Sequence, residues 1–147
     1  MMIDIYLPIV PPKVTSQTKR VKVIAGRPMF FPKKEHQQAE HDLIALIAPY
    51  APACPLDGPV KMRIDFRFPW RKSETRKRRA MVRVPCDVKP DLDNMAKLIG
   101  DVLTKLQFYR DDGQVADLRL TKSWGDDVGI RIVVGKIEVE NKQPQLI

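Results

Sequence analysis

An alternation of apolar and polar side chains gives the clearest signal along this chain, over residues 60–68. Valine, methionine, isoleucine and phenylalanine occupy every second position there, and lysine, arginine and aspartate fill the positions between them. A period of two predicts a β-strand with one buried face. Residues 2–7 predict a shorter first strand, which Pro8, Pro11 and Pro12 end.

Two further strands are predicted near the end of the chain, over residues 114–124 and 129–140. Gly125-Asp126-Asp127 lies between them and is typical of a turn, so we expect a hairpin. The apolar phase of the last strand slips at Gly135, which predicts a β-bulge that restores the register.

A period of 3.6 residues predicts two helices, from about Lys34 to Pro49 and from Asp91 to Leu106. Their expected buried side chains are Ala39, Leu43, Leu46 and Ile47 in the first helix and Leu92, Met95, Ala96, Ile99, Val102, Leu103 and Leu106 in the second. Residues 13–32 predict a basic loop or irregular hairpin, and the proline-rich residues 49–59 predict a connector.

These elements predict an α+β fold, in which a small mixed or antiparallel sheet of about four strands packs with two main helices. A length of 147 residues is that of one domain, so we expect a single domain over residues 1–147. We expect residues 70–90 to form a basic loop and residues 141–147 to form a loose polar tail.

The positive charge of the chain is confined to one segment. Residues 61–90 hold eleven Lys or Arg and three Asp or Glu, so this segment alone carries the whole formal net charge of +8. Such a block attracts the phosphates of nucleic acid through counterion release. The alternative interpretation is a solvated or disordered basic loop.

Directly after the basic segment comes the acidic run Lys89-Pro90-Asp91-Leu92-Asp93-Asn94, with Lys97 following it and Asp111-Asp112 further on. Clustered carboxylates repel phosphate unless a cation lies between them, so the combination indicates a divalent metal held against a phosphodiester. The alternative is structural, because Asp91 as an N-cap and Asp93 in the first turn both stabilise a helix. Asp111-Asp112-Gly113 is likewise an ordinary turn sequence.

Oxygen ligands alone favour Mg²⁺, with Mn²⁺ as a substitute, over zinc. The two histidines, His36 and His41, are five residues apart and are assigned to a solvated helix face. Asp112 reaches Asp91 and Asp93 only if the strand after it runs antiparallel to the helix. Asp93 and Lys97 are four residues apart on one helix face, where the amine can stabilise negative charge on phosphate.

The acidic run resembles the signature of the RusA Holliday junction resolvases, small endonucleases of bacteria and their phages. The resemblance rests on Pro-Asp-Leu-Asp-Asn at residues 90–94, Lys97 and Asp-Asp-Gly-Gln-Val at residues 111–115. It implies a homodimer that cleaves four-way DNA junctions by two symmetric nicks with Mg²⁺. It also implies that Asp91, Asp93 and Asp112 bind metal and that Lys97 is catalytic, with Asp111 as the alternative to Asp112.

Basic side chains are the expected contacts to the DNA backbone. Those assigned to it are Lys13, Arg20, Lys33, Lys34, Arg71, Lys72, Arg76, Lys77, Arg78 and Arg79. The loop over residues 70–88 is longer than in compact members of the family. The aromatic side chains Trp70, Trp124, Phe108 and Tyr109 are expected to pack rather than to stack on bases.

Two other functions fit the same sequence. One is a non-catalytic DNA-binding or architectural protein whose acids only cap a helix, and the other is a nuclease for other branched or RNA-containing substrates. No apolar run is long enough to span a membrane, and Met1 to Asp4 show no basic leader. Cys54 and Cys86 have no metal-site spacing and fit a reducing compartment, so we expect a cytoplasmic protein.

Overall fold

A mixed five-stranded sheet forms the centre of the molecule, with the strands in the order β1-β7-β4-β6-β5. The strands are β1 (Met2–Leu7), β4 (Val60–Phe68), β5 (Arg83–Pro85), β6 (Val115–Gly125) and β7 (Gly129–Lys136). The pair β4 and β6 is parallel, and the other three pairs are antiparallel. The computed structural model describes residues 1–13, 19–32 and 34–142, and it describes only the backbone of residues 19–24 and 28–32.

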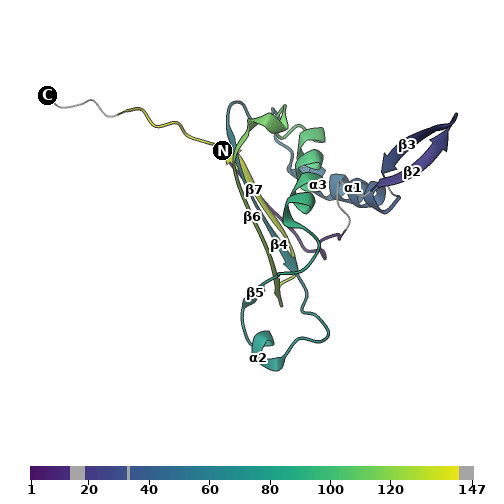
Figure 1. Ribbon diagram of the computed structural model, residues 1–147. Helices are drawn as coiled ribbons and strands as arrows, with labels where there is room; N and C mark the ends of the chain where they lie inside the picture. The colour runs from purple at the N-terminus through teal and green to yellow at the C-terminus, as the bar shows by residue number, and fades with distance from the viewer. Residues whose placement is uncertain (14–18, 33, 143–147) are drawn as a thin grey trace.

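Two helices of 14 residues, α1 (Lys34–Ile47) and α3 (Leu92–Lys105), lie on one face of the sheet (Figure 1). A two-stranded hairpin, β2 (Lys19–Ile24) and β3 (Arg27–Pro32), projects beyond α1. The short elements are α2 (Arg76–Arg79) and the 3₁₀ turns η1 (Ala48–Tyr50) and η2 (Asp112–Gln114). The predicted α+β fold with two main helices is therefore confirmed. Across the described residues, each helix is too short or too polar to cross a membrane.

The core fills the space between the sheet and the two helices. The apolar positions predicted for residues 60–68 are all buried, and so is most of the predicted stripe of α3. In α1 the prediction was partly wrong, because Leu46 is 39% exposed and His36 is buried. His36 lies seven residues before the buried Leu43, two helical turns along the same face. Only His41 lies on the solvated face that was predicted for both histidines.

The hairpin predicted at Gly125-Asp126-Asp127 is wrong, because β4 lies between β6 and β7 and pairs with both. The turn at residues 125–127 instead connects β6 to β7 across the end of β4. The bulge predicted at Gly135 is also wrong, since β7 ends at Lys136 with its pairing to β1 unbroken. Gly135 instead permits close packing, since a Cβ there would lie 2.7 Å from the backbone carbonyl oxygen of Met1.

The face of the sheet opposite the helices carries charged side chains, and Asp65 on β4 is buried among them. Asp65 accepts hydrogen bonds from Oγ1 of Thr121 at 2.6 Å and from Nε of Arg63 at 3.2 Å. Burial alone would raise the pKa of Asp65. The hydrogen bonds from Thr121 and Arg63 and the charges of Arg63 and Arg67 outweigh burial, so the pKa is lowered.

We therefore expect Asp65→Asn to lower the free energy of unfolding at pH 7 by about 2 kcal/mol, the typical value of hydrogen bonds to a charged group. A lowered pKa means that the carboxylate stabilises the fold above its ordinary pKa and loses this effect as the pH falls through the folded-state pKa. Urea denaturation at pH 7 and pH 3 measures the effect, with the exposed Asp117→Asn on the same face as control. An equal effect of the two variants at pH 7 would contradict this account of Asp65.

Candidate active site at the start of helix α3

Helix α3 begins at an aspartate that does not act as a hydrogen-bonded cap. Asp91 is the N-cap residue with extended dihedrals (φ −68°, ψ 134°), as predicted, but its side chain makes no capping hydrogen bond. Asp93 follows in the first turn, and both side chains are exposed. The positive end of the helix dipole stabilises this pair of negative charges. The carboxylate of Asp91 is thus available for a ligand instead of being used to hold the helix.

The hollow beside Asp91 has a basic rim. It has a volume of about 280 Å³ and is lined by Lys13, Lys89, Pro90, Asp91 and Asn94. Lys13 and Lys89 also line an adjoining hollow of about 290 Å³, which reaches Trp70, Arg71 and Trp124 at the base of the basic loop. The two hollows form a basic path from the acids to this loop, which suits a phosphate chain.

Asn94 also lines this hollow. Its Oδ1 atom is buried and has no hydrogen-bond partner among the described residues. Asp91 and Asp93 offer carboxylate oxygen atoms, the ligand type that Mg²⁺ prefers. The chemistry of this end of α3 therefore fits a hard divalent cation. Asn94 was not among the predicted site residues, although it lies within the motif at residues 90–94.

Lys122 on β6 fixes the segment that leads into α3. Its ammonium donates hydrogen bonds to the carbonyl oxygen of Pro90, at 2.9 Å, and to that of Val88. These bonds join the end of β6 to the start of α3. Residues 88–91 are thereby held against the sheet, and the position of Asp91 is set by the fold.

The exposed face of α3 carries Asp93, Lys97 and Asp101, as their spacing predicted. Lys97 lies one helical turn beyond Asp93, about 6 Å along the axis. Burial raises the pKa of Asp101, and the negative charges of Glu40 and Asp112 raise it further. Asp112 is thus close to Asp101, near the other end of α3.

Asp111 and Asp112 have different roles in the turn before β6. The carboxylate of Asp111 accepts a hydrogen bond from the backbone N–H of Gly113 at 3.0 Å and forms a capping box with Gln114. This bond lowers the pKa of Asp111. Asp111 is therefore used to hold the turn, which favours Asp112 as the carboxylate that takes part in function.

The predicted metal ligands do not all meet within one chain. Asp91 and Asp93 lie together at the start of α3, whereas Asp112 lies beside Asp101. In the part of the chain that the structure describes, no group of three His, Cys, Asp or Glu side chains is placed to hold a metal ion. A metal site built from all three aspartates would need one of them from a second molecule.

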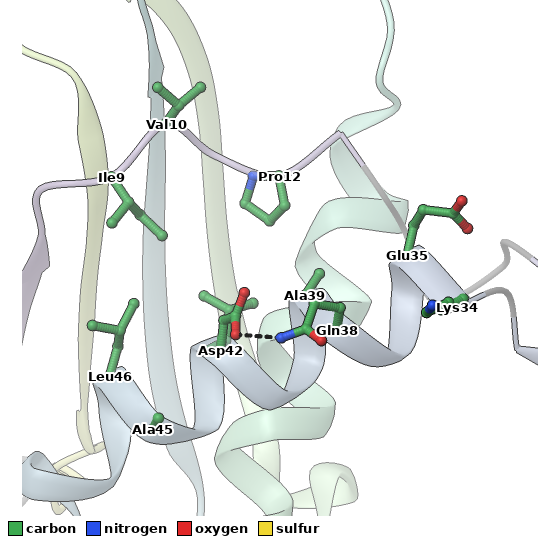
Figure 2. A pocket seen from close by; sticks show the side chains of 11 residues that line it. Ile9, Val10, Pro12, Lys34, Glu35, Gln38, Ala39, Asp42, Ala45 and Leu46 are labelled. Carbon is green, nitrogen blue, oxygen red and sulfur yellow. Dashed lines mark hydrogen bonds between the residues drawn. The ribbon is translucent and has the colours of Figure 1, made fainter.

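A larger hollow of about 880 Å³ lies between residues 9–12 and α1, and Figure 2 shows its lining. Apolar side chains such as Val10 and Leu46 form much of its surface. Its acids, Glu35 and Asp42, are two helical turns apart, about 10 Å. Asp42 accepts a hydrogen bond from the Gln38 amide at 2.8 Å. This hollow therefore lacks two acids as close in sequence as Asp91 and Asp93.

A comparison with protein families identifies the chain. Residues 8–135 match the family model described as "Endodeoxyribonuclease RusA", which covers most of the sequence. The chain belongs to the RusA endodeoxyribonuclease family. The resemblance predicted from residues 90–97 and 111–115 is thereby confirmed. A RusA endodeoxyribonuclease is a hydrolase of DNA, so the protein is an enzyme.

Two relatives show how far the likeness to individual proteins extends. YqaN of Bacillus subtilis, an uncharacterized protein, is 28% identical over 100 residues, which cover 64% of this chain and 70% of YqaN. The crossover junction endodeoxyribonuclease RusA of Escherichia coli K12 is 41% identical over 64 residues, 44% of this chain and 40% of that protein. The match to the E. coli enzyme thus spans less than half of its length.

The basic residues predicted to contact DNA lie in different parts of this RusA family member. Lys13 lines the hollow at Asp91, and Lys34 is exposed at the start of α1. Lys33 and the side chain of Arg20 lie outside the described residues.

The aromatic residues predicted to pack do so. Phe108, Tyr109 and Trp124 are buried, and the indole N–H of Trp70 donates a hydrogen bond to Asp126 at 2.8 Å.

Gln114 has a structural role that the sequence analysis missed. Its amide nitrogen donates to the carbonyl oxygens of Leu56 and Gly58, both at 2.9 Å. Its amide oxygen accepts from the backbone N–H groups of Arg110 and Asp111, at 2.8 Å and 3.1 Å. One side chain thus ties the turn that carries Asp112 to the segment before β4. The only sequence signal was its place in the motif at residues 111–115.

We expect Gln114→Ala to lower the free energy of unfolding by about 3 kcal/mol, because four hydrogen bonds of about 1 kcal/mol each are lost and water replaces some of them. Urea denaturation measures this loss. Gln38→Ala is the matched control, because its amide makes one exposed hydrogen bond, to Asp42. Equal stability of the two variants would show that Gln114 does not hold the turn.

Proposed function

We propose that this protein is a divalent-metal-dependent endonuclease that resolves four-way DNA junctions by paired symmetric nicks. The observation that carries the proposal is the state of Asp91, an N-cap whose carboxylate makes no capping bond and faces a basic hollow. Family membership supports the nuclease activity, and the name of the E. coli relative supports the crossover junction as substrate.

The acids at the start of α3 would hold Mg²⁺, with Mn²⁺ as a substitute. When bound, such a cation supplies positive charge beside the scissile phosphate and lowers the pKa of a water. Asp91 and Asp93 would provide its carboxylate ligands, and Asp91 and Asn94 line the hollow. The ammonium of Lys97, one turn further along, stabilises the negative charge that develops on the phosphate. Lys13 and Lys89 bind the flanking phosphates.

A homodimer would supply the missing aspartate. Within one chain Asp112 lies beside Asp101, towards the opposite end of α3 from Asp91. In a two-fold dimer that packs the exposed faces of α3 antiparallel, Asp112 of each copy would approach Asp91 and Asp93 of the other copy. Gly100 on this face supports close approach, since a Cβ there would have no atom within 4 Å. Two such sites related by symmetry account for two symmetric nicks.

We expect Asp93→Asn to abolish junction cleavage in Mg²⁺, because a metal ligand is lost, while junction binding and the free energy of unfolding change little. Gel assays with a labelled four-way junction measure cleavage and binding, and Asp117→Asn is the control. Unchanged cleavage by Asp93→Asn would contradict the assignment of the acids. Binding by the wild type without any metal-dependent product would favour a non-catalytic DNA-binding protein.

A site that combines Asp91 and Asp93 of one copy with Asp112 of the other predicts how a mixture of two inactive variants behaves. Asp93→Asn and Asp112→Asn should each be inactive alone, and a mixture should regain cleavage, because each mixed dimer then contains one complete site. The recovered product should be a single nick rather than a resolved junction. Differently tagged copies confirm that mixed dimers form. If they form and no ratio restores nicking, the ligands do not come from two chains.

A further inference from the structure

The basic loop between β4 and α3 is a folded element. The Glu74 side chain is 2% exposed and forms ion pairs with Arg71 at 3.3 Å and Arg78 at 3.6 Å. Arg79 donates to the carbonyl oxygens of Arg71, at 2.7 Å, and Glu74, at 3.2 Å. The hydroxyl of Thr75 caps α2. A buried acid and a capped helical turn distinguish this loop from a solvated charge run.

The loop is also fixed to the end of the sheet. The guanidinium of Arg71 stacks 4.3 Å from the ring centre of Trp124, and β5 pairs with the last residues of β6. Arg83 forms an ion pair with Asp127 in the turn before β7. A Cβ on Gly125 would lie 3.0 Å from the carbonyl oxygen of Val82, so the loop packs closely on the strand end. These contacts fix the position of the loop relative to the hollow at Asp91.

The basic side chains of the loop divide into two sets. Arg71, Arg78 and Arg79 hold the loop together, as described above. The side chains of Lys72, Arg76 and Lys77 are exposed, and no hydrogen bond or ion pair engages them within the described ranges. Residues 71–83 hold seven Lys or Arg and one Glu, a net charge of +6. The second set is therefore available to phosphates.

Two exposed apolar side chains lie between α2 and β5, where this charged loop returns to the sheet. Met81 is 49% exposed and Val82 is 85% exposed, directly after α2. Proteins that bend or open DNA combine such apolar wedges, inserted between base steps, with basic side chains on the neighbouring phosphates. Insertion into an intact duplex costs a few kcal/mol per unstacked step. At a branch point the stack is already interrupted, so we expect the cost to be lower there.

We propose that Met81 and Val82 insert between bases at the branch point of a DNA junction, while Lys72, Arg76 and Lys77 hold the adjacent phosphates. The charge around the pair favours nucleic acid over a protein as the occupant. This inference rests on the proposed function for its substrate class. It gives the long loop a role in selecting branched over linear DNA, separate from the cleavage chemistry at Asp91 and Asp93.

A junction with 2-aminopurine at the branch point tests the insertion, because the fluorescence of this base rises when it unstacks. The measurements are made in Ca²⁺ without Mg²⁺, so that binding is observed separately from cleavage. We expect the wild type to raise the fluorescence severalfold. The double variant Met81→Ser/Val82→Ser should abolish most of this rise and lower the preference for junctions over linear duplexes about tenfold. Its affinity for the duplex should change less than twofold.

Two controls separate insertion from other effects. Val139→Ser, which alters a side chain that is 79% exposed on the C-terminal segment, should behave as the wild type. The triple variant Lys72→Gln/Arg76→Gln/Lys77→Gln should weaken binding to every DNA and reduce the slope of log affinity against log salt by about three.

The proposal is overturned if the wild type causes no rise in fluorescence or if the double variant keeps it. It is also overturned if the double variant loses affinity equally for duplex and junction, or if it only changes self-association of the protein. Asp93→Asn should retain the fluorescence rise. A wild type that unstacks the base but never cleaves in Mg²⁺ would end the proposed catalysis and leave the insertion standing.

Discussion

Strands β4 and β6 pair in parallel, and this pairing sets the path of the chain between them. Parallel neighbours need a crossover connection, and here the crossover is the whole of residues 69–114. The chain leaves β4 at one end of the sheet, forms the basic loop and begins α3 there. Helix α3 then returns along the sheet, so that the turn with Asp112 lies at the other end (Figure 1). One pairing thus brings the basic loop next to Asp91 and separates Asp112 from it.

Electrostatics explains why the two ends of α3 differ. At its start, the helix dipole, Lys13 and Lys89 surround acids that have no bond to the helix backbone. At its other end, Asp101 lies among Glu40, Asp112 and Lys105, and its pKa is raised by burial and by the like charges. Asp111, beside these groups, is held in a capping box. Only the start of α3 combines unbonded carboxylates with a basic path for a phosphate chain.

The sequence predicted the local structure well because each signal was local. The alternation over residues 60–68 and the apolar stripe of α3 correspond to real elements, since both periods record which face is buried. The extended N-cap at Asp91 was also predictable, from Pro90 before it. Helix α2 and strand β5 were not predicted within residues 70–88, because they depend on contacts with Glu74 and with the edge of β6.

Long-range pairing was the part that the sequence could not predict. The turn at residues 125–127 has the composition of a hairpin, yet β4 inserts between β6 and β7. The burial of His36 depends on how α1 packs against the sheet and α3, and its two-turn spacing to Leu43 was the available signal. The motif indicated Asp91, Asp93 and Asp112 as one site, but the structure of one chain separates them. Spacing along the sequence does not show how far apart the two ends of a helix place their side chains.

If the unbonded carboxylates at the start of α3 hold a divalent cation, a crystal of the protein soaked in Mn²⁺ should show it, because anomalous scattering locates the ion. We expect one anomalous peak per chain, contacted by the carboxylates of Asp91 and Asp93. A peak elsewhere, or no peak with Asp91 bonded to the backbone N–H groups of α3, would contradict this assignment.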